Sequence, residues 1–155
     1  MPAPRDPKAG APAGVPRGTP SRRRPFEYAI VRVVPRVERG ERFNAGVIVH
    51  SRPHRYLGAR TWLDETVLQA LAPECDPGAV QPHLDAIVRI AAGDASAGAI
   101  ARLTRAERFH WLVAPSSTVV QASEVHTGLT DDPAAELDHL FQTLILDRRR
   151  ATPST

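Results

Sequence analysis

Three apolar runs in the first half of the chain have the composition of β-strands. The run FEYAIVRVVP at residues 26–35 is rich in β-branched side chains and ends at a proline. Its apolar residues fall on both faces, which predicts a central strand covered on both sides. The run RFNAGVIVH at residues 42–50 predicts a second strand, and Gly46 within it indicates a bulge or a close backbone approach. RYLGART at residues 55–61 predicts a third.

Helical patterns follow, separated by proline and glycine. Asp64 is placed to cap a short helix at residues 65–71. A longer helix is expected to begin at Pro82, because a proline inside a helix loses a hydrogen bond, and to end at Gly93. Residues 94–103 are rich in alanine and predict no single element. The clearest helical periodicity follows the Asp-Asp-Pro sequence at residues 131–133, with apolar side chains at Leu137, Leu140, Phe141, Leu144 and Ile145.

The segment RFHWLVAPSSTVVQASEVHTG at residues 108–128 predicts a β-hairpin that turns at Pro115 and Ser116. A two-residue turn pairs His110 with Gln121 on one face. A longer loop with a shifted register is the alternative, because Pro-Ser is not a favoured two-residue turn. The opposite face is more apolar and is expected to point into the core, with Phe109, Trp111 and Val113 on it.

Two short motifs flank this predicted hairpin. Thr104 and Glu107 have the spacing of a capping box, here expected for a single helical turn before the strand. EVHTGLT at residues 124–130 is typical of a loop. The elements together predict an α+β domain with a mostly antiparallel sheet, made of two or three N-terminal strands and the later hairpin. Two or three helices, including the amphipathic C-terminal helix, are expected to pack on it. Trp62 is also expected in the core.

Charge and proline divide the chain of 155 residues into three parts. Residues 1–25 hold seven prolines, six Lys or Arg and one acid, which predicts a disordered tail. Residues 26–147 hold eleven Arg against sixteen Asp or Glu and are expected to form one domain. Residues 148–155 begin with three arginines and are expected to be a basic, frayed end. The net charge of +3 therefore comes from the two ends, which argues against a nucleic-acid surface on the domain itself.

Cysteine and hydropathy indicate the compartment. Cys75 is the only cysteine, so the chain forms no internal disulfide, and a reducing compartment is expected. The chain shows neither an apolar signal core nor a membrane-spanning run, and the cytoplasm is predicted. His50 and His54 are separated by Pro53 and no Cys or carboxylate cluster completes a set, so no metal and no cofactor are expected.

Several motifs together resemble a known bacterial family. YAIVRVVP, RFNAGVIV, RFHWLVAP and STVVQ followed by VHTGL are similar, in order and spacing, to the domain of unknown function 3037 family, over residues 28–146. The family has no established activity, cofactor or catalytic residue. Its members often lie beside a gene for a HipA-like kinase, so the resemblance implies such a kinase as a partner.

Polar residues inside the apolar runs are the candidates for a ligand- or partner-binding site. Arg32 lies among β-branched residues and must pair with an acid, reach an edge or hold an anion. Strict alternation places Asn44 and Gly46 on one face of the second strand with Ile48 and His50. The remaining candidates are His110, Gln121, His126, Thr127 and Gly128. No serine-nucleophile motif or phosphate loop is present, so no catalytic residue is assigned.

Three functions remain open on the sequence. The first is a small interaction or regulatory domain with a polar surface formed by Arg32, Asn44, His110 and the His126 loop. The second is an enzyme acting on an anionic or nucleotide-like substrate, with Arg32 binding the anion and a histidine moving the proton. The third is a nucleic-acid accessory protein that uses the basic tail. The first function is favoured, because polar residues recur in the strands without a reaction motif.

Overall fold

The computed structural model describes residues 23–147, so the expectations for the tail and the basic end lie almost entirely outside the described residues. The sheet of this part has five antiparallel strands: β1 (Arg24–Val33), β2 (Phe43–Ser51), β3 (Tyr56–Thr61), β4 (Val120–Ala122) and β5 (His126–Thr130). Their order is β3-β2-β1-β4, and β5 also pairs with β1. The strand β1 is therefore central, as predicted.

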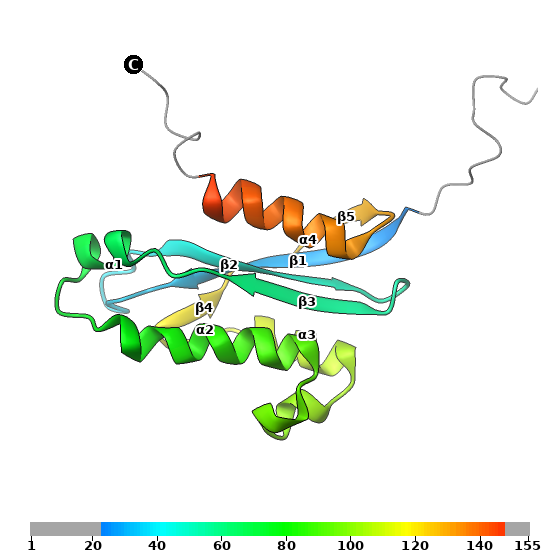
Figure 1. Ribbon diagram of the computed structural model, residues 1–155, viewed down its shortest axis with the longest axis horizontal. Coiled ribbons are helices and arrows are strands. Elements are labelled where there is room, and N and C mark those ends of the chain that lie inside the picture. Colours follow the sequence, from blue (N-terminus) through cyan, green and yellow to red (C-terminus); the bar gives the residue numbers. More distant parts are fainter. Residues whose placement is uncertain (1–22, 148–155) are drawn as a thin grey trace, which may run out of the picture.

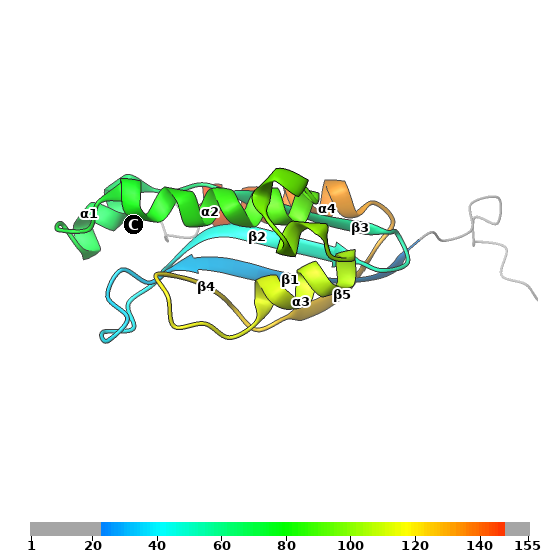
Figure 2. The ribbon, with the colours of Figure 1, turned by 90° about the horizontal axis from the view of Figure 1, so that it is seen from below.

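Helices cover both faces of this sheet (Figures 1 and 2). The helices are α1 (Glu65–Leu71), α2 (Pro77–Ala92), α3 (Arg105–Val113) and α4 (Pro133–Phe141), with short 3-10 turns η2 (Ala95–Ala97) and η3 (Ile100–Arg102). The helix α4 continues into a π-helical turn, η4 (Gln142–Leu146). In Figure 1, α2 and α3 lie on one face and α4 on the other. The predicted α+β class is confirmed.

The two layers bury two separate apolar cores. Val31 and Val33 of β1 belong to the core on the α2 and α3 side, together with Leu84, Phe109 and Leu112 among others. Phe26 belongs to the core under α4, together with Val47, Val49, Leu137, Phe141 and Ile145. A strand buried on both faces must carry apolar residues in both phases, which explains the near-continuous apolar run in β1.

A bulge in β2 changes which face its residues occupy. Val31 pairs with Gly46 and Arg32 pairs with Asn44, so Ala45 is the extra residue. As a result Phe43, Ala45 and Ile48 share the core on the α2 and α3 side, whereas Val47 and Val49 lie under α4. The prediction of strict alternation through this strand was wrong, because one inserted residue reverses the phase.

Both expectations for Gly46 itself are met. The bulge lies beside it, and a Cβ atom at this position would lie 2.7 Å from the carbonyl oxygen of Arg60 in β3. Only glycine lets β2 and β3 approach this closely.

The helix α2 begins five residues earlier than predicted. Asp76 accepts a hydrogen bond from the Gly78 amide, and Pro77 occupies the first helical position. Pro82 lies inside the helix with an exposed side chain. Val80 and Leu84, one helical turn apart, are both fully buried, so core packing on this face offsets the hydrogen bond lost at the proline. The predicted caps at Asp64 and Gly93 are confirmed, and the Asp-Asp-Pro sequence starts α4, with Asp132 as its cap.

The predicted hairpin at residues 108–128 was wrong. Thr104 and Glu107 do form a capping box, and it starts the nine-residue helix α3 instead of a single turn. Phe109 and Leu112 are buried at helical spacing. Trp111, expected in the core, is 51% exposed, and Trp62 is 42% exposed. The β-type composition of this segment is overridden by a helix with a strong cap and a buried face.

After α3 the chain forms two short strands, β4 and β5, where the second strand of the predicted hairpin was expected. β4 pairs with β1, and residues expected to form a loop make β5. Between them the Ser123 hydroxyl accepts a hydrogen bond from the Ile30 amide (2.8 Å), and the Ser123 amide donates to the Ile30 carbonyl (2.8 Å). Ser123 therefore joins β4 and β5 into one bent edge along β1.

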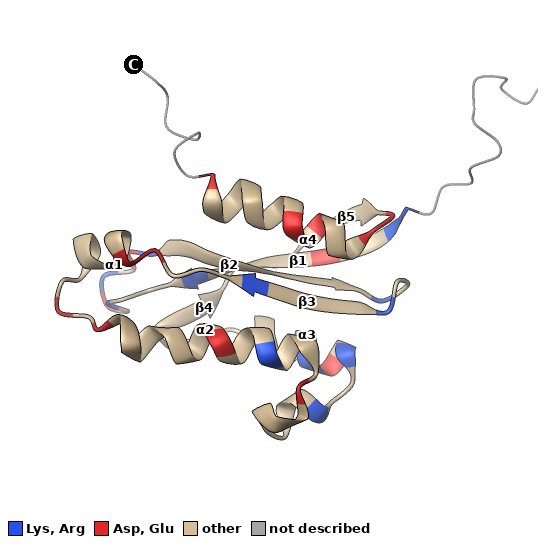
Figure 3. Ribbon diagram, viewed as in Figure 1, with Lys and Arg blue, Asp and Glu red and all other residues tan. Residues whose placement is uncertain are grey.

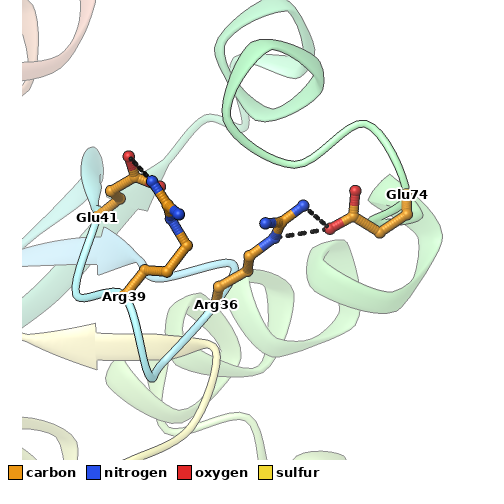
Figure 4. A network of polar contacts seen from close by, with 4 residues as sticks. All are labelled: Arg36, Arg39, Glu41 and Glu74. Atoms are coloured by element: carbon orange, nitrogen blue, oxygen red, sulfur yellow. Dashed lines mark hydrogen bonds and ion pairs between the residues drawn. The ribbon is translucent and has the colours of Figure 1, made fainter.

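Exposed ion pairs hold the connection between β1 and β2 (Figure 4). Arg36 Nε donates to Glu74 Oε1 at 2.8 Å, which links this connection to the turn between α1 and α2. Arg39 Nε donates to Glu41 Oε1 at 2.8 Å within the connection itself. Within residues 23–147, no helix has both the length and the apolar character needed to cross a membrane.

Candidate functional site

The candidates Arg32, Asn44 and Gln121 lie in one row across three strands. Arg32 pairs with Asn44 of β2 on one side and with Gln121 of β4 on the other. Arg32 is in phase with Phe26 and Tyr28, which lie in the core under α4, so it faces the α4 layer. Asn44 Nδ2 donates to the Leu144 carbonyl oxygen of η4 at 3.4 Å, which places it in the same layer.

Gln121 is in register with Arg32, but its amide turns away from this row. Its Nε2 donates to the Thr118 carbonyl oxygen at 2.8 Å. The half-buried Arg32 guanidinium makes no hydrogen bond or ion pair with any residue of the described range 23–147. Arg32 and Asn44 are therefore the two residues of this row that stay on the α4 side, and Asn44 contacts η4.

His126 lies on the same side as Arg32. Its ring is 5.1 Å from that of Tyr28, its partner in β1, and Nε2 is 3.6 Å from Glu124 Oε1. The pKa of Glu124 is lowered, first by a hydrogen bond from its own backbone amide and then by the charges of His126, Arg32 and Arg42. Thr127 is exposed in β5, and a Cβ atom at Gly128 would lie 2.7 Å from the Phe26 ring.

His110 is separated from this group. It is exposed on α3, and α3 lies on the opposite face of the sheet from α4 (Figure 1). Its predicted cross-strand contact with Gln121 was wrong, because residue 110 is helical. The predicted polar surface is therefore divided: Arg32, Asn44 and His126 lie on the α4 side, and His110 lies beyond the sheet.

His50 and His54 have structural contacts. The His50 side chain is 8% exposed, with Nδ1 3.2 Å from Glu27 Oε1 and its ring stacked on Phe109. His54 Nε2 lies 3.0 Å from the Thr130 carbonyl oxygen. In the part of the chain that the structure describes, no three His, Cys, Asp or Glu side chains gather as a metal site would require.

A pocket of about 400 Å³ lies between α2, α3 and the β4 edge. This volume is in the range of small-molecule pockets. Apolar side chains form most of the wall, with Val31, Ile87, Ile90, Leu112 and Val120 among them. Trp111 lines the pocket with an indole that is half exposed to solvent.

Polar groups of this pocket come from α2, from the loop at residues 114–118 and from β4. His83, Ser116, Thr118 and Gln121 line it. The Ser116 and Thr118 hydroxyls lie 2.9 Å apart, Ser116 Oγ accepts from the Thr118 amide, and Thr118 Oγ1 donates to the Val120 carbonyl oxygen. The loop is therefore held by its own hydrogen bonds.

Sequence reasoning missed this pocket. Of the predicted site residues only Gln121 lines it, and Trp111 was assigned to the core. A usable signal was nevertheless present, because Thr104 and Glu107 cap a helix that is long enough to include Trp111.

The fold and the pocket define a small α+β domain with helices on both faces of an antiparallel sheet. The chain belongs to the family described as Protein of unknown function (DUF3037), whose model matches residues 28–145. No curated protein and no solved structure matches the chain.

Proposed function

We propose that this protein is a small interaction domain that binds a partner protein through the surface around Trp111. One observation carries the proposal: a half-exposed indole lines an apolar pocket of about 400 Å³. Tryptophan is enriched among the residues that dominate binding energy, and such residues typically contact pockets on the partner or line their own. An exposed apolar surface of this kind marks a binding site more often than an isolated exposed side chain does.

The partner proposed is a HipA-like kinase, which the family resemblance implies. Binding is favoured over catalysis by the chemistry of the pocket. The Ser116 hydroxyl contacts Thr118 and not a histidine, so no general base activates it.

The test is a calorimetric titration of the purified full chain with a HipA-like kinase from the same genome. It measures the dissociation constant of the complex. We expect Trp111→Ala to weaken the complex by about tenfold or more, the effect typical of an interface hot spot. Trp62→Ala is the matched control, because Trp62 is similarly exposed (42%) and does not line the pocket. Equal binding by Trp111→Ala and wild type would place the interface elsewhere. Absence of binding by wild type would exclude this kinase as the partner.

A second function is favoured by the state of Arg32. Its guanidinium has no ion-pair partner within residues 23–147, Arg32 is in register with Asn44 of β2, and the fixed fork of a guanidinium suits a carboxylate or phosphate group. We propose an anionic or nucleotide-like substrate for this site, with His126 as the histidine that moves the proton, since it shares the α4 side. A thermal-shift panel of phosphate and nucleotides tests it: stabilisation lost in Arg32→Gln supports the site, and no shift by any of them excludes it.

A further inference from the structure

We infer that the pocket beside Trp111 accepts one bulky, uncharged side chain of the partner, aromatic or leucine-like, with the flanking peptide groups of that residue at the rim. This inference rests on the proposed function and adds the chemistry of the contact. It concerns the part of the molecule formed by α2, α3 and the 114–118 loop.

The size of the pocket sets the size of the side chain that it can bind. A space of about 400 Å³ holds an aromatic or large aliphatic side chain together with part of its backbone. The deep wall is made by side chains from three different elements: Ile90 of α2, Leu112 of α3 and Val31 of β1. These three residues belong to the well-packed core, so the pocket is preformed.

The absence of charge in the wall of the pocket determines which side chains it can bind. None of the residues that line the pocket is Asp, Glu, Lys or Arg, and His83 is its one ionisable residue. The stretch from Trp111 to Ser123 contains no charged residue at all. Figure 3 agrees: charged segments lie on α2 and at the start of α3, and β4 has none. A charged side chain in this pocket would lose its hydration without gaining an ion pair. The bound side chain is therefore neutral.

The rim supplies partners for a peptide backbone. Gln121 holds an amide there, and Ser116 and Thr118 hold hydroxyls, in a loop already fixed by internal hydrogen bonds. Hydroxyls and amides both donate and accept, which matches the N–H and C=O groups on either side of an anchor residue. Trp111 then contacts the apolar side chain from the wall of the pocket. A free apolar molecule would fill the wall without adding hydrogen bonds to these rim groups.

The experiment uses capped amino acids as probes of a single anchor residue. The ¹⁵N-labelled full chain is titrated with the N-acetyl amides of phenylalanine, tryptophan and leucine, and with those of glutamate and lysine as charged counterparts. We expect the neutral probes to shift the amide signals of pocket residues such as Leu112 and Val120 saturably, with millimolar dissociation constants, as expected for ligands of this size. The charged probes should bind at least tenfold more weakly.

Two substitutions on α2 separate the pocket from the general surface. Ala86→Trp fills the space, because Ala86 lines the pocket, and should abolish the shifts. Ala92→Trp is the matched control, since Ala92 is exposed at the end of the same helix and does not line the pocket. Should Ala86→Trp fail to fold, Trp111→Ala replaces it and should weaken probe binding at least fivefold.

Three outcomes would overturn the inference. They are charged probes that bind as tightly as neutral ones, no saturable shift with any probe, or free indole that binds more tightly than N-acetyltryptophanamide. The last result would indicate a free small molecule instead of an anchor residue. The proposed function is judged separately by the kinase titration: a complex that depends on Trp111 stands even where no probe binds, and probe binding stands where the kinase does not bind.

Discussion

His50 of β2 stacks on Phe109 of α3, with ring centroids 4.7 Å apart and planes inclined by 22°. The contact joins the middle of the sheet to a helix that local composition alone assigned to a strand. On the sheet, His50 is held by Glu27, its cross-strand partner in β1. The apolar side of α3 therefore packs on β2 at His50. Trp111 lies on the opposite side of the same helix, where it is exposed to solvent.

Phe109 and Trp111 should respond in opposite ways to truncation. Phe109 is 2% exposed, so Phe109→Ala should lower the free energy of unfolding by about 3–5 kcal/mol, the usual cost of removing a buried ring. Trp111→Ala should cost less than about 1 kcal/mol, as for an exposed position. Urea denaturation of the two variants measures both values. Equal losses would indicate that Trp111 is buried in solution and would contradict the helix.

Gly46→Ala should destabilise the sheet at the bulge. The added methyl group would lie 2.7 Å from the Arg60 carbonyl oxygen and 2.8 Å from Thr61 Cγ2, so the backbones of β2 and β3 must separate. We expect a loss of about 1–3 kcal/mol in thermal or chemical unfolding, as for overpacking of a tight site. A variant within about 0.5 kcal/mol of wild type would show that this pair of strands is loosely packed.

Stability should fall in acid through the cap of α3. Hydrogen bonds from the Thr104 amide and hydroxyl lower the pKa of Glu107 below its ordinary value. A carboxyl whose pKa is lower in the folded state contributes stability that is fully present above its unfolded pKa and is lost as pH falls through the folded value.

Glu107→Gln keeps a capping side chain without the charge. Its melting temperature should therefore fall less steeply than that of wild type when the pH is lowered from about 5 to 3, where carboxyl groups titrate. The comparison is a series of thermal melts of both proteins. Parallel pH profiles would show that the carboxylate form of Glu107 is not what the cap requires.

Arg32 should influence the titration of Glu124. Its charge is one of the causes that lower the pKa of this carboxyl, so Arg32→Met should raise the pKa of Glu124 toward the ordinary value. NMR titration of the Glu124 carboxyl carbon measures the change. Arg52→Met is the control, because Arg52 is exposed in the β2–β3 turn and does not act on Glu124. No difference between the two variants would mean that Arg32 is directed away from Glu124.

The sequence predicted only part of the candidate site. Arg32 and Asn44 were chosen because they interrupt apolar strands, and the register does bring them side by side. His110 was chosen on a hairpin that does not exist, and it lies across the sheet from them. The pocket was missed, because its wall is assembled from three elements that are distant in the chain, and none of its residues is unusual within its own segment.

The sequence by itself determined the elements whose signals are local. Asp64 sets the start of α1, and Asp132 with Pro133 sets the start of α4. Gly93 ends α2. In β1, apolar residues at both odd and even positions require a strand that is covered on both faces. Each depends on a backbone hydrogen bond or a side-chain period that a few neighbouring residues decide.

Only the tertiary structure decided the rest. The segment at residues 105–113 has both a helix cap and strand-forming side chains, and the burial of Phe109 and Leu112 against the sheet favours the helix. One extra residue at Ala45 reverses the faces of β2, and β5 becomes a strand because β1 offers it an unpaired edge. These outcomes depend on the packing energy between segments that are far apart in sequence, and this energy outweighs local propensity where the two disagree.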